Sequence, residues 1–268
     1  MRTDATQRSE QFRALHERAE ILLLPGVWDV ASARIFAAEG FPALGTTSTG
    51  ICWSVGRERG WPTFLEASNR IADAVSIPVS FDIESGFSDD LREIEAHVSQ
   101  VIDAGACGIN LEDGFDGGTL IDPQRHVEKL QTIGALCTKR NYPLFVNART
   151  DVFLGGSGDL RDAIDRCNRY VEAGADSVFV PGLIREPDIA VFVREVAVPV
   201  NIYALPGVPP PARLLELGVR RISLGCGPHQ SALAHIRAIA RSLDERTDYR
   251  LFTDDWIPYE EAEQLCSA

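Results

Sequence analysis

A short pattern that recurs along the chain constrains its fold more than any other feature of the sequence. Each copy runs from an apparent helix end through a glycine into an apolar run, as in AAEGFPALGTTS, DAGACGINLEDG, EAGADSVFVPG and ELGVRRISLGCG. Glycine just past a helix end is a common stop signal, and the runs that follow have the length and composition of strands. Strands that alternate with helices favour right-handed βαβ units and a parallel sheet.

Collecting all runs of this kind gives eight candidate strands. They lie at 21–27, 42–48, 77–84, 107–113, 143–149, 176–182, 199–205 and 220–226. Eight βα units in 268 residues predict a (β/α)8 TIM-type barrel. An open dinucleotide-binding sheet would require a G-x-G-x-x-G motif after the first run, and the sequence has none there. We expect one domain over 1–268, with the barrel at about 20–243 and a C-terminal extension with an extra helix at 244–268.

Composition narrows the classes of partner. A net charge of −13 argues against nucleic acid and against an anionic membrane, because both are bound through Lys and Arg, but it permits a small anionic substrate. The longest apolar stretch, ILLLPGVW, is too short to span a bilayer, and the polar N-terminus has no signal-peptide core. The six cysteines form no C-x-x-C motif, which is typical of structural thiols in a reducing compartment. We therefore expect a cytoplasmic protein.

Polar and charged residues concentrate where the predicted strands end. The barrel rim would be built from TTSTG (46–50), DIES (82–85), NLEDG (110–114), NARTD (147–151) and NIYALPG (201–207). In (β/α)8 barrels the chemistry lies at this C-terminal end of the strands. The sequence thus places its unusual residues where an active site is expected.

Three acids at the rim indicate a metal site. Asp82 and Glu84 are two apart on a predicted strand and should share a face, and Glu112 ends the neighbouring strand. Carboxylates that converge raise each other's pKa unless a cation lies among them, and oxygen ligands without His or Cys suit Mg²⁺ or Mn²⁺. The alternative is that such acids cap the following helices, for which Asp113 is the strongest candidate.

An arginine and a small-residue turn indicate an anion site nearby. Arg149 ends a predicted strand and could bind a carboxylate or phosphonate in bidentate fashion, or form a salt bridge to Asp151 or a rim acid. The turn at Ser48, Thr49 and Gly50 could cradle an anion with its backbone N–H groups.

Together these motifs resemble the phosphoenolpyruvate mutase/isocitrate lyase superfamily, from GVWDVASAR to GCGPHQSAL. The anchors are GVWD, DIESGF, GINLEDG, NARTD and VFVPG, in this order. The resemblance implies a Mg²⁺-bound oxo-acid or its enolate at the barrel mouth. It also implies homodimers or homotetramers that exchange a C-terminal helix.

The resemblance implies a role for each rim residue. Asp82 would bind the metal directly, and Glu84 and Glu112 would act mainly through metal-bound water. The predicted catalytic residues are Arg149 and Glu112. The substrate would be held by Arg149, with contributions from Asn201 and the turn formed by Ser48, Thr49 and Gly50.

Two loops depart from the pattern of the superfamily. Many relatives carry an aspartate at the place of Arg59, in the run GRERG, and Glu58 could replace it only with a one-residue shift. The lyases that act on isocitrate and methylisocitrate carry a K-x-C-G-H loop with a proton-donating cysteine. Here the loop reads FDGGTLID, without Cys, Lys or His. Asp116 could donate a proton only with a raised pKa, and the glycines of the loop indicate an exposure that argues against one.

The sequence therefore predicts a Mg²⁺-dependent lyase or hydrolase that cleaves a C–C bond in a small α-oxo or α-hydroxy carboxylic acid through a metal-stabilised enolate. We expect little or no cleavage of isocitrate or 2-methylisocitrate. The alternatives are P–C bond chemistry, of the phosphonopyruvate hydrolase or phosphoenolpyruvate mutase type, and a non-catalytic barrel that binds an oxo-acid.

Overall fold

The computed structural model describes residues 2–57, 59–115, 119–154, 158–244, 249–254 and 256–266. Its centre is a parallel sheet in the order β1-β11-β10-β9-β8-β5-β4-β3-β2, and a two-stranded antiparallel hairpin, β6-β7, stands apart from it. The strands are β1 Leu22–Leu24, β2 Gly26–Val27, β3 Leu44–Thr46, β4 Val79–Asp82, β5 Gly108–Glu112, β6 Gly114–Phe115, β7 Thr119–Leu120, β8 Phe145–Arg149, β9 Ser177–Phe179, β10 Val200–Tyr203 and β11 Arg221–Ser223.

Pro25 interrupts the first strand of the barrel and divides it into β1 and β2. Proline has no N–H to donate to a neighbouring strand. Its carbonyl still accepts a hydrogen bond from Gly45 N at 2.9 Å, and Leu24 O accepts one from Leu224 N at 3.0 Å. β1 pairs with β11 and β2 pairs with β3, so the two halves of this strand close the ring. The predicted (β/α)8 barrel is confirmed.

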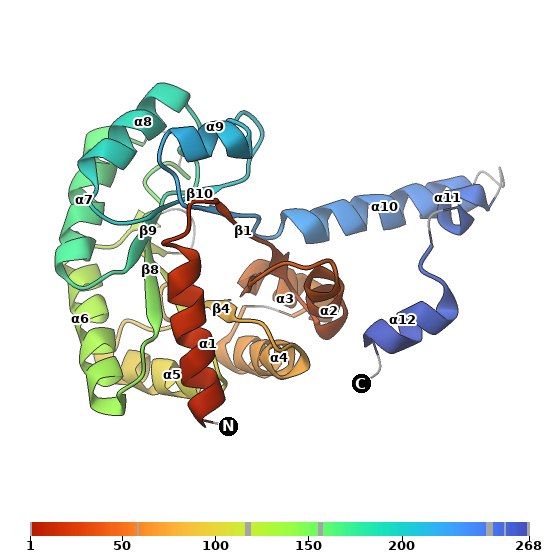
Figure 1. Ribbon diagram of the computed structural model, residues 1–268, viewed down its shortest axis with the longest axis horizontal. Helices are drawn as coiled ribbons and strands as arrows, with labels where there is room; N and C mark the ends of the chain where they lie inside the picture. Colours follow the sequence, from red (N-terminus) through yellow and green to blue (C-terminus); the bar gives the residue numbers. More distant parts are fainter. Residues whose placement is uncertain are drawn as a thin grey trace.

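Helices surround the strands (Figure 1). They are α1 Arg2–Leu15, α2 Val30–Ala38, α3 Ser48–Val55, α4 Trp61–Ala74, α5 Leu91–Asp103, α6 Pro123–Arg140, α7 Leu160–Glu172, α8 Glu186–Glu195, α9 Pro211–Glu216, α10 Gly227–Asp244, α11 Arg250–Thr253 and α12 Tyr259–Cys266. Aspartates cap the N-termini of several of them, among them Asp122 for α6 and Asp159 for α7.

Successive side chains along each strand point alternately into the apolar layer between strands and helices and into the inside of the barrel. Side chains such as Ile109, Leu111 and Val146 point outward into the apolar layer between strands and helices. Their neighbours Asn110 and Asn147 point into the barrel and are hydrogen-bonded to one another at 2.8 Å. At the other end, α1 packs Phe12 against Phe145 and covers the N-terminal end of the strands.

The C-terminal part of the chain leaves the barrel. α10 extends away from it, and α12 turns back toward α2 (Figure 1), where Arg34 Nη1 donates to Leu265 O at 3.3 Å. The expected extension thus contains two helices in its described part, α11 and α12, where the sequence predicted one. No helix in the described ranges is long and apolar enough to cross a membrane, and all six cysteines are free thiols.

Candidate active site

A small cavity of about 190 Å³ opens among the C-terminal ends of the barrel strands. It is far smaller than the roughly 300–1,000 Å³ of pockets that accept drug-sized ligands. Polar and charged side chains from six parts of the barrel wall line it. They include Thr49, Asp82, Asn110, Arg149, Tyr203 and Arg221.

Asp82 lines this cavity and Glu84 lies near enough for the two charges to interact, although the strand ends sooner than the sequence suggested. β4 stops at Asp82, and Glu84 follows in a left-handed conformation with φ 49°. The predicted strand to residue 84 is therefore wrong at its end, and the reason is the turn closed by Gly86 N to Ile83 O at 2.8 Å. Non-glycine residues enter this region at a cost of about 1–2 kcal/mol, so this loop holds strain beside the cavity.

The two acids influence each other. Burial raises the pKa of Glu84, the charge on Asp82 raises it further, and Ser48 and Arg59 oppose the change. Ser48 Oγ donates to Asp82 Oδ2 at 3.3 Å. Asp82 Oδ1 and Glu84 Oε1 are buried and have no hydrogen-bond partner among the described residues. Two buried carboxylate oxygens without partners are unfavourable for the folded protein and are the kind of group that a bound cation would satisfy.

Glu112 is engaged differently, with Arg149. Its carboxylate lies 2.7 Å from Arg149 Nη1, and on the other side Arg149 Nε contacts Asp151 at 2.5 Å. Burial raises the pKa of Glu112 to about 8 against the attraction of Arg149. The guanidinium thus lies between two carboxylates, as the salt-bridge alternative predicted, and still lines the cavity.

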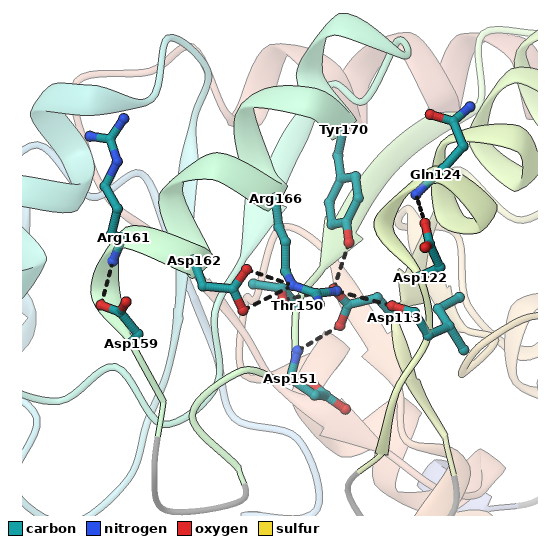
Figure 2. Close-up of polar contacts among 11 residues, drawn as sticks. Asp113, Asp122, Gln124, Thr150, Asp151, Asp159, Arg161, Asp162, Arg166 and Tyr170 are labelled. Carbon is teal, nitrogen blue, oxygen red and sulfur yellow. Dashed lines mark hydrogen bonds and ion pairs between the residues drawn. The ribbon is translucent and has the colours of Figure 1, made fainter.

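Asp113 is a buried anchor and not a helix cap, which corrects the expectation from sequence. Its carboxylate accepts hydrogen bonds from Thr150 Oγ1 at 2.8 Å, from Tyr170 Oη at 2.6 Å and from the backbone N of Asp151 at 2.9 Å (Figure 2). Arg166 adds an ion pair at 3.1 Å. Glu112 precedes Asp113 in the chain, and the backbone of Asp151 donates to the Asp113 carboxylate, so this anchor fixes the two residues whose carboxylates hold Arg149.

The segment with Ser48, Thr49 and Gly50 is the first turn of α3 and not a loop turn. Thr47 caps this helix and accepts a hydrogen bond from Gly50 N at 3.3 Å, so that N–H does not face an anion. Thr49 lines the cavity. Gly50 packs below it, because a Cβ there would lie 2.6 Å from the Thr47 methyl group. The structure therefore brings Ser48 and Thr49 to the site and leaves Gly50 behind them.

Asn201 does not line the cavity and lies deeper in the barrel than the residues that do. It is fully buried in β10 and its Nδ2 donates to Ser223 Oγ at 2.9 Å, whereas its Oδ1 has no partner among the described residues. Glu58 and Asp116, the two acids considered on the neighbouring loops, lie outside the described residues.

The acids fit a hard cation better than a soft one. Among the described residues, no group of three or more His, Cys, Asp or Glu side chains is arranged to bind a metal jointly. Oxygen donors with few direct protein contacts suit Mg²⁺, which keeps several waters. Asp82 would hold such an ion directly, and Glu84 would hold it through water.

Comparisons with known proteins decide the family. The family model described as phosphoenolpyruvate phosphomutase matches residues 12–244. An uncharacterised protein of Mycobacterium tuberculosis is 40% identical over 239 residues, which cover 87% of this chain and 89% of that protein. The chain belongs to the phosphoenolpyruvate mutase/isocitrate lyase superfamily.

Relatives within this superfamily include lyases and mutases. A 2-methylisocitrate lyase of Aeropyrum pernix is 31% identical over 199 residues, covering 70% of this chain and 62% of that enzyme. A solved structure from Burkholderia cenocepacia, provisionally named a lyase/mutase, has a TM-score of 0.93 and 29% identity, and covers 99% of this chain and 98% of its own. The barrel is thus that of an enzyme superfamily.

The position where many members of the superfamily carry an aspartate is part of the site here. Arg59 Nη1 lies 3.6 Å from Glu84 Oε1, and its Nη2 donates to Thr49 Oγ1 at 2.9 Å. The guanidinium therefore adds positive charge at the mouth of the cavity, and half of its side chain is exposed.

Sequence reasoning missed Arg221 in the cavity wall, and it placed Asn110 and Tyr203 in the rim segments without giving either a role. The signal was present in the buried runs GINLE, VNIY and RIS, where every second residue is polar. Alternation of this kind in a closed barrel places polar side chains inside it.

Proposed function

We propose that this protein is a Mg²⁺-dependent enzyme that cleaves a C–C bond in a small α-oxo or α-hydroxy carboxylic acid through an enolate-type species. The observation that carries the proposal is the pairing of two features in one small cavity. Asp82 offers a buried carboxylate oxygen without a partner, and Arg149 presents a guanidinium to the same space.

Each residue has a defined task in this proposal. Mg²⁺, when bound, supplies positive charge that stabilises an enolate. Asp82 and Glu84 hold the ion, and Arg149 binds the carboxylate of the substrate with the N–H groups not used by Glu112 and Asp151. Glu112 orients Arg149, and the small volume excludes bulk water. Groups fixed before the substrate arrives cost little reorganisation, which makes electrostatic stabilisation effective.

The loop after β5 bears on the substrate. The lyases acting on isocitrate and methylisocitrate would require a cysteine between Gly114 and Asp122, and the chain has none there. We infer little or no cleavage of isocitrate or 2-methylisocitrate, and activity on a smaller oxo-acid. The relatives named 2-methylisocitrate lyase support C–C chemistry in general and not that substrate.

Two other functions have an observation in their favour. P–C bond chemistry is supported by the match to the phosphoenolpyruvate phosphomutase family. A barrel that binds an oxo-acid without turnover is supported by Arg59, which pairs with Glu84 where many relatives carry an acid.

A substrate panel with purified protein and Mg²⁺ tests the proposal. It contains isocitrate, 2-methylisocitrate, oxaloacetate, dimethylmalate and phosphonopyruvate. We expect turnover of oxaloacetate or dimethylmalate that stops when EDTA is added. Turnover of phosphonopyruvate alone would favour P–C chemistry, and binding without any turnover would favour the non-catalytic barrel. Efficient cleavage of 2-methylisocitrate would show that the loop does not limit the substrate.

A further inference from the structure

A second arginine reaches the cavity from inside the barrel. Arg221 begins β11, is 1% exposed, and lines the cavity together with Arg149. Its Nη2 donates to Asn110 Oδ1 at 3.1 Å, on β5, and its Nε donates to Ser223 Oγ at 3.1 Å. β11 and β5 are four places apart in the ring, so the side chain crosses the barrel interior beneath the cavity.

Arg221 has no carboxylate in direct contact with its guanidinium among the described residues. Its contacts are an amide oxygen and a hydroxyl, and no ion pair of the described residues includes it. Its Nη1 has no hydrogen-bond partner among them. Arg149 differs in this respect, because Glu112 and Asp151 compensate its charge. Of the two guanidiniums at this cavity, Arg221 is therefore the one without an ion-pair partner, and the charge on Asp82 acts on it only from a distance.

A buried charge of this kind is costly for the folded protein. Removing an ion from water costs several kcal/mol unless a counter-charge and hydrogen bonds replace the solvent. Burial lowers the pKa of Arg221 to about 9, and the charge on Asp82 limits the decrease. At neutral pH the guanidinium therefore stays mainly protonated. Asn110 is also held in place for it, since Asn147 Nδ2 donates to the same Oδ1 at 2.8 Å.

We propose that Arg221 is an anion-binding residue on the floor of the cavity, which binds the second anionic group of the substrate and makes the site select small dianions over monoanions. An anionic oxygen at this place gives Nη1 the partner that it lacks and supplies the missing counter-charge. This inference rests on the proposed function, because it assumes that the cavity binds the oxo-acid.

The geometry narrows the substrate class. Arg149 and Arg221 line the same cavity of about 190 Å³, which limits a ligand held by both to a few carbon atoms. A short dicarboxylate with an α-oxo group satisfies both guanidiniums, and a mono-acid such as pyruvate satisfies one. We therefore expect the substrate to be an α-oxo or α-hydroxy dicarboxylate.

Binding of oxalate and oxamate tests the inference. The two molecules have nearly the same shape, but oxamate replaces one carboxylate with a neutral amide. Calorimetry would measure both affinities for the wild type, Arg221→Met and Arg221→Lys, with Mg²⁺ and again with EDTA. We expect the wild type to prefer oxalate by tenfold or more. In Arg221→Met the preference should fall by about fivefold or more relative to the wild type, and Arg221→Lys should keep part of it, because a positive charge remains and charged hydrogen bonds are the stronger ones.

Controls separate this inference from other effects. Arg220→Met changes the neighbouring arginine, which does not line the cavity, and should keep the wild-type preference. Coordination of oxalate by Mg²⁺ is common to all variants and cancels when their preferences are compared. The inference would be overturned if folded Arg221→Met lost affinity for oxalate and oxamate equally, or if its preference for oxalate were that of the wild type. So would a wild type that binds oxamate as tightly as oxalate, a result that requires no variant to fold. Absence of turnover together with a preference that depends on Arg221 would overturn the enzymatic function alone.

Discussion

At the scale of single residues, most charged groups near the cavity have a partner of opposite sign. Arg149 lies between Glu112 and Asp151, and Arg59 lies beside Glu84. The negatively charged Asp82 and the positively charged Arg221 have no such ion pair among the described residues. Unsatisfied buried groups are rare in folded proteins and are concentrated where a ligand completes them. Under the proposed function, these two residues mark the places of the cation and of the anion.

The direct role of Asp82 gives the first prediction. Asp82→Asn removes a charged oxygen ligand, so the affinity for Mg²⁺ should fall by roughly 100-fold, with a thermal melting temperature close to that of the wild type. Glu84→Gln is the matched control, and because Glu84 acts through water, its loss should be closer to about tenfold. Titration calorimetry with Mg²⁺ would measure both. Equal affinities of Asp82→Asn and the wild type would refute the assignment of the ligand.

The Asp113 anchor gives the second prediction. Tyr170→Phe removes one hydrogen bond to a fully buried carboxylate, so the free energy of unfolding should fall by about 1.5–3 kcal/mol. Tyr142→Phe removes a comparable hydroxyl that donates to the neutral carbonyl of Ala106 at 2.8 Å, and should cost about 0.5–1.5 kcal/mol. Urea unfolding of both variants would compare them. A loss in Tyr142→Phe as large as in Tyr170→Phe would show that the charge of Asp113 does not matter.

At the scale of the elements, the sequence predicted the order and positions of the strands well but not their ends. Local composition shows where an apolar run lies, but the residue at which a strand ends depends on its last hydrogen bond to the neighbouring strand. β4 ends at Asp82 because the chain turns at Ile83, and α3 begins at Ser48 because Thr47 caps it. The acids at 82 and 84 meet through a strained turn and not through strand alternation.

A buried histidine on α6 gives a prediction for pH. His126 packs against Tyr170, both of its ring nitrogens lack hydrogen-bond partners, and burial lowers its pKa to about 3, helped by Lys129 and Arg166. The unfolded chain binds a proton at this residue below about pH 6.5 and the folded chain does not. Stability is therefore lost as the pH falls from about 6.5 toward 3, by up to about 1.4 kcal/mol per pH unit.

His126→Leu removes this proton-linked term and keeps a side chain of similar volume. The difference in unfolding free energy between the variant and the wild type should shift in favour of the variant as the pH falls from 7 to 4. Urea titrations at several pH values would measure it. Parallel stability profiles of the two proteins would contradict the pKa of His126.

At the scale of the whole molecule, the sequence was sufficient for the barrel and for most of its rim. Asp82, Arg149 and Thr49 line one cavity, as the rim motifs predicted. The sequence did not show that Arg221 reaches Asn110, 111 positions earlier in the chain, because that contact depends on closure of the ring. It also could not show that Asp113 turns inward while its neighbour Glu112 faces Arg149.

The C-terminal helices give the last prediction, which concerns assembly. α10 extends from the barrel (Figure 1), and it and the segment after it expose large apolar side chains. Ile236 is 60% exposed, Trp256 64% and Tyr259 81%. Apolar surface of this kind marks interaction sites, and the superfamily resemblance implies helix exchange between subunits. We expect a homodimer or homotetramer whose subunits cover these helices.

Light scattering with size-exclusion chromatography would measure the mass of the wild type and of Ile236→Asp. The charge should weaken an interface on α10 and shift the protein toward monomer at micromolar concentration. His235→Asp, on the same exposed helix, is the matched control for a surface charge without the loss of an apolar contact. If His235→Asp dissociates the assembly as strongly, charge alone explains the effect. A wild type that is monomeric at 100 micromolar or so would exclude a stable interface, because such interfaces commonly reach dissociation constants of about 1 μM or below.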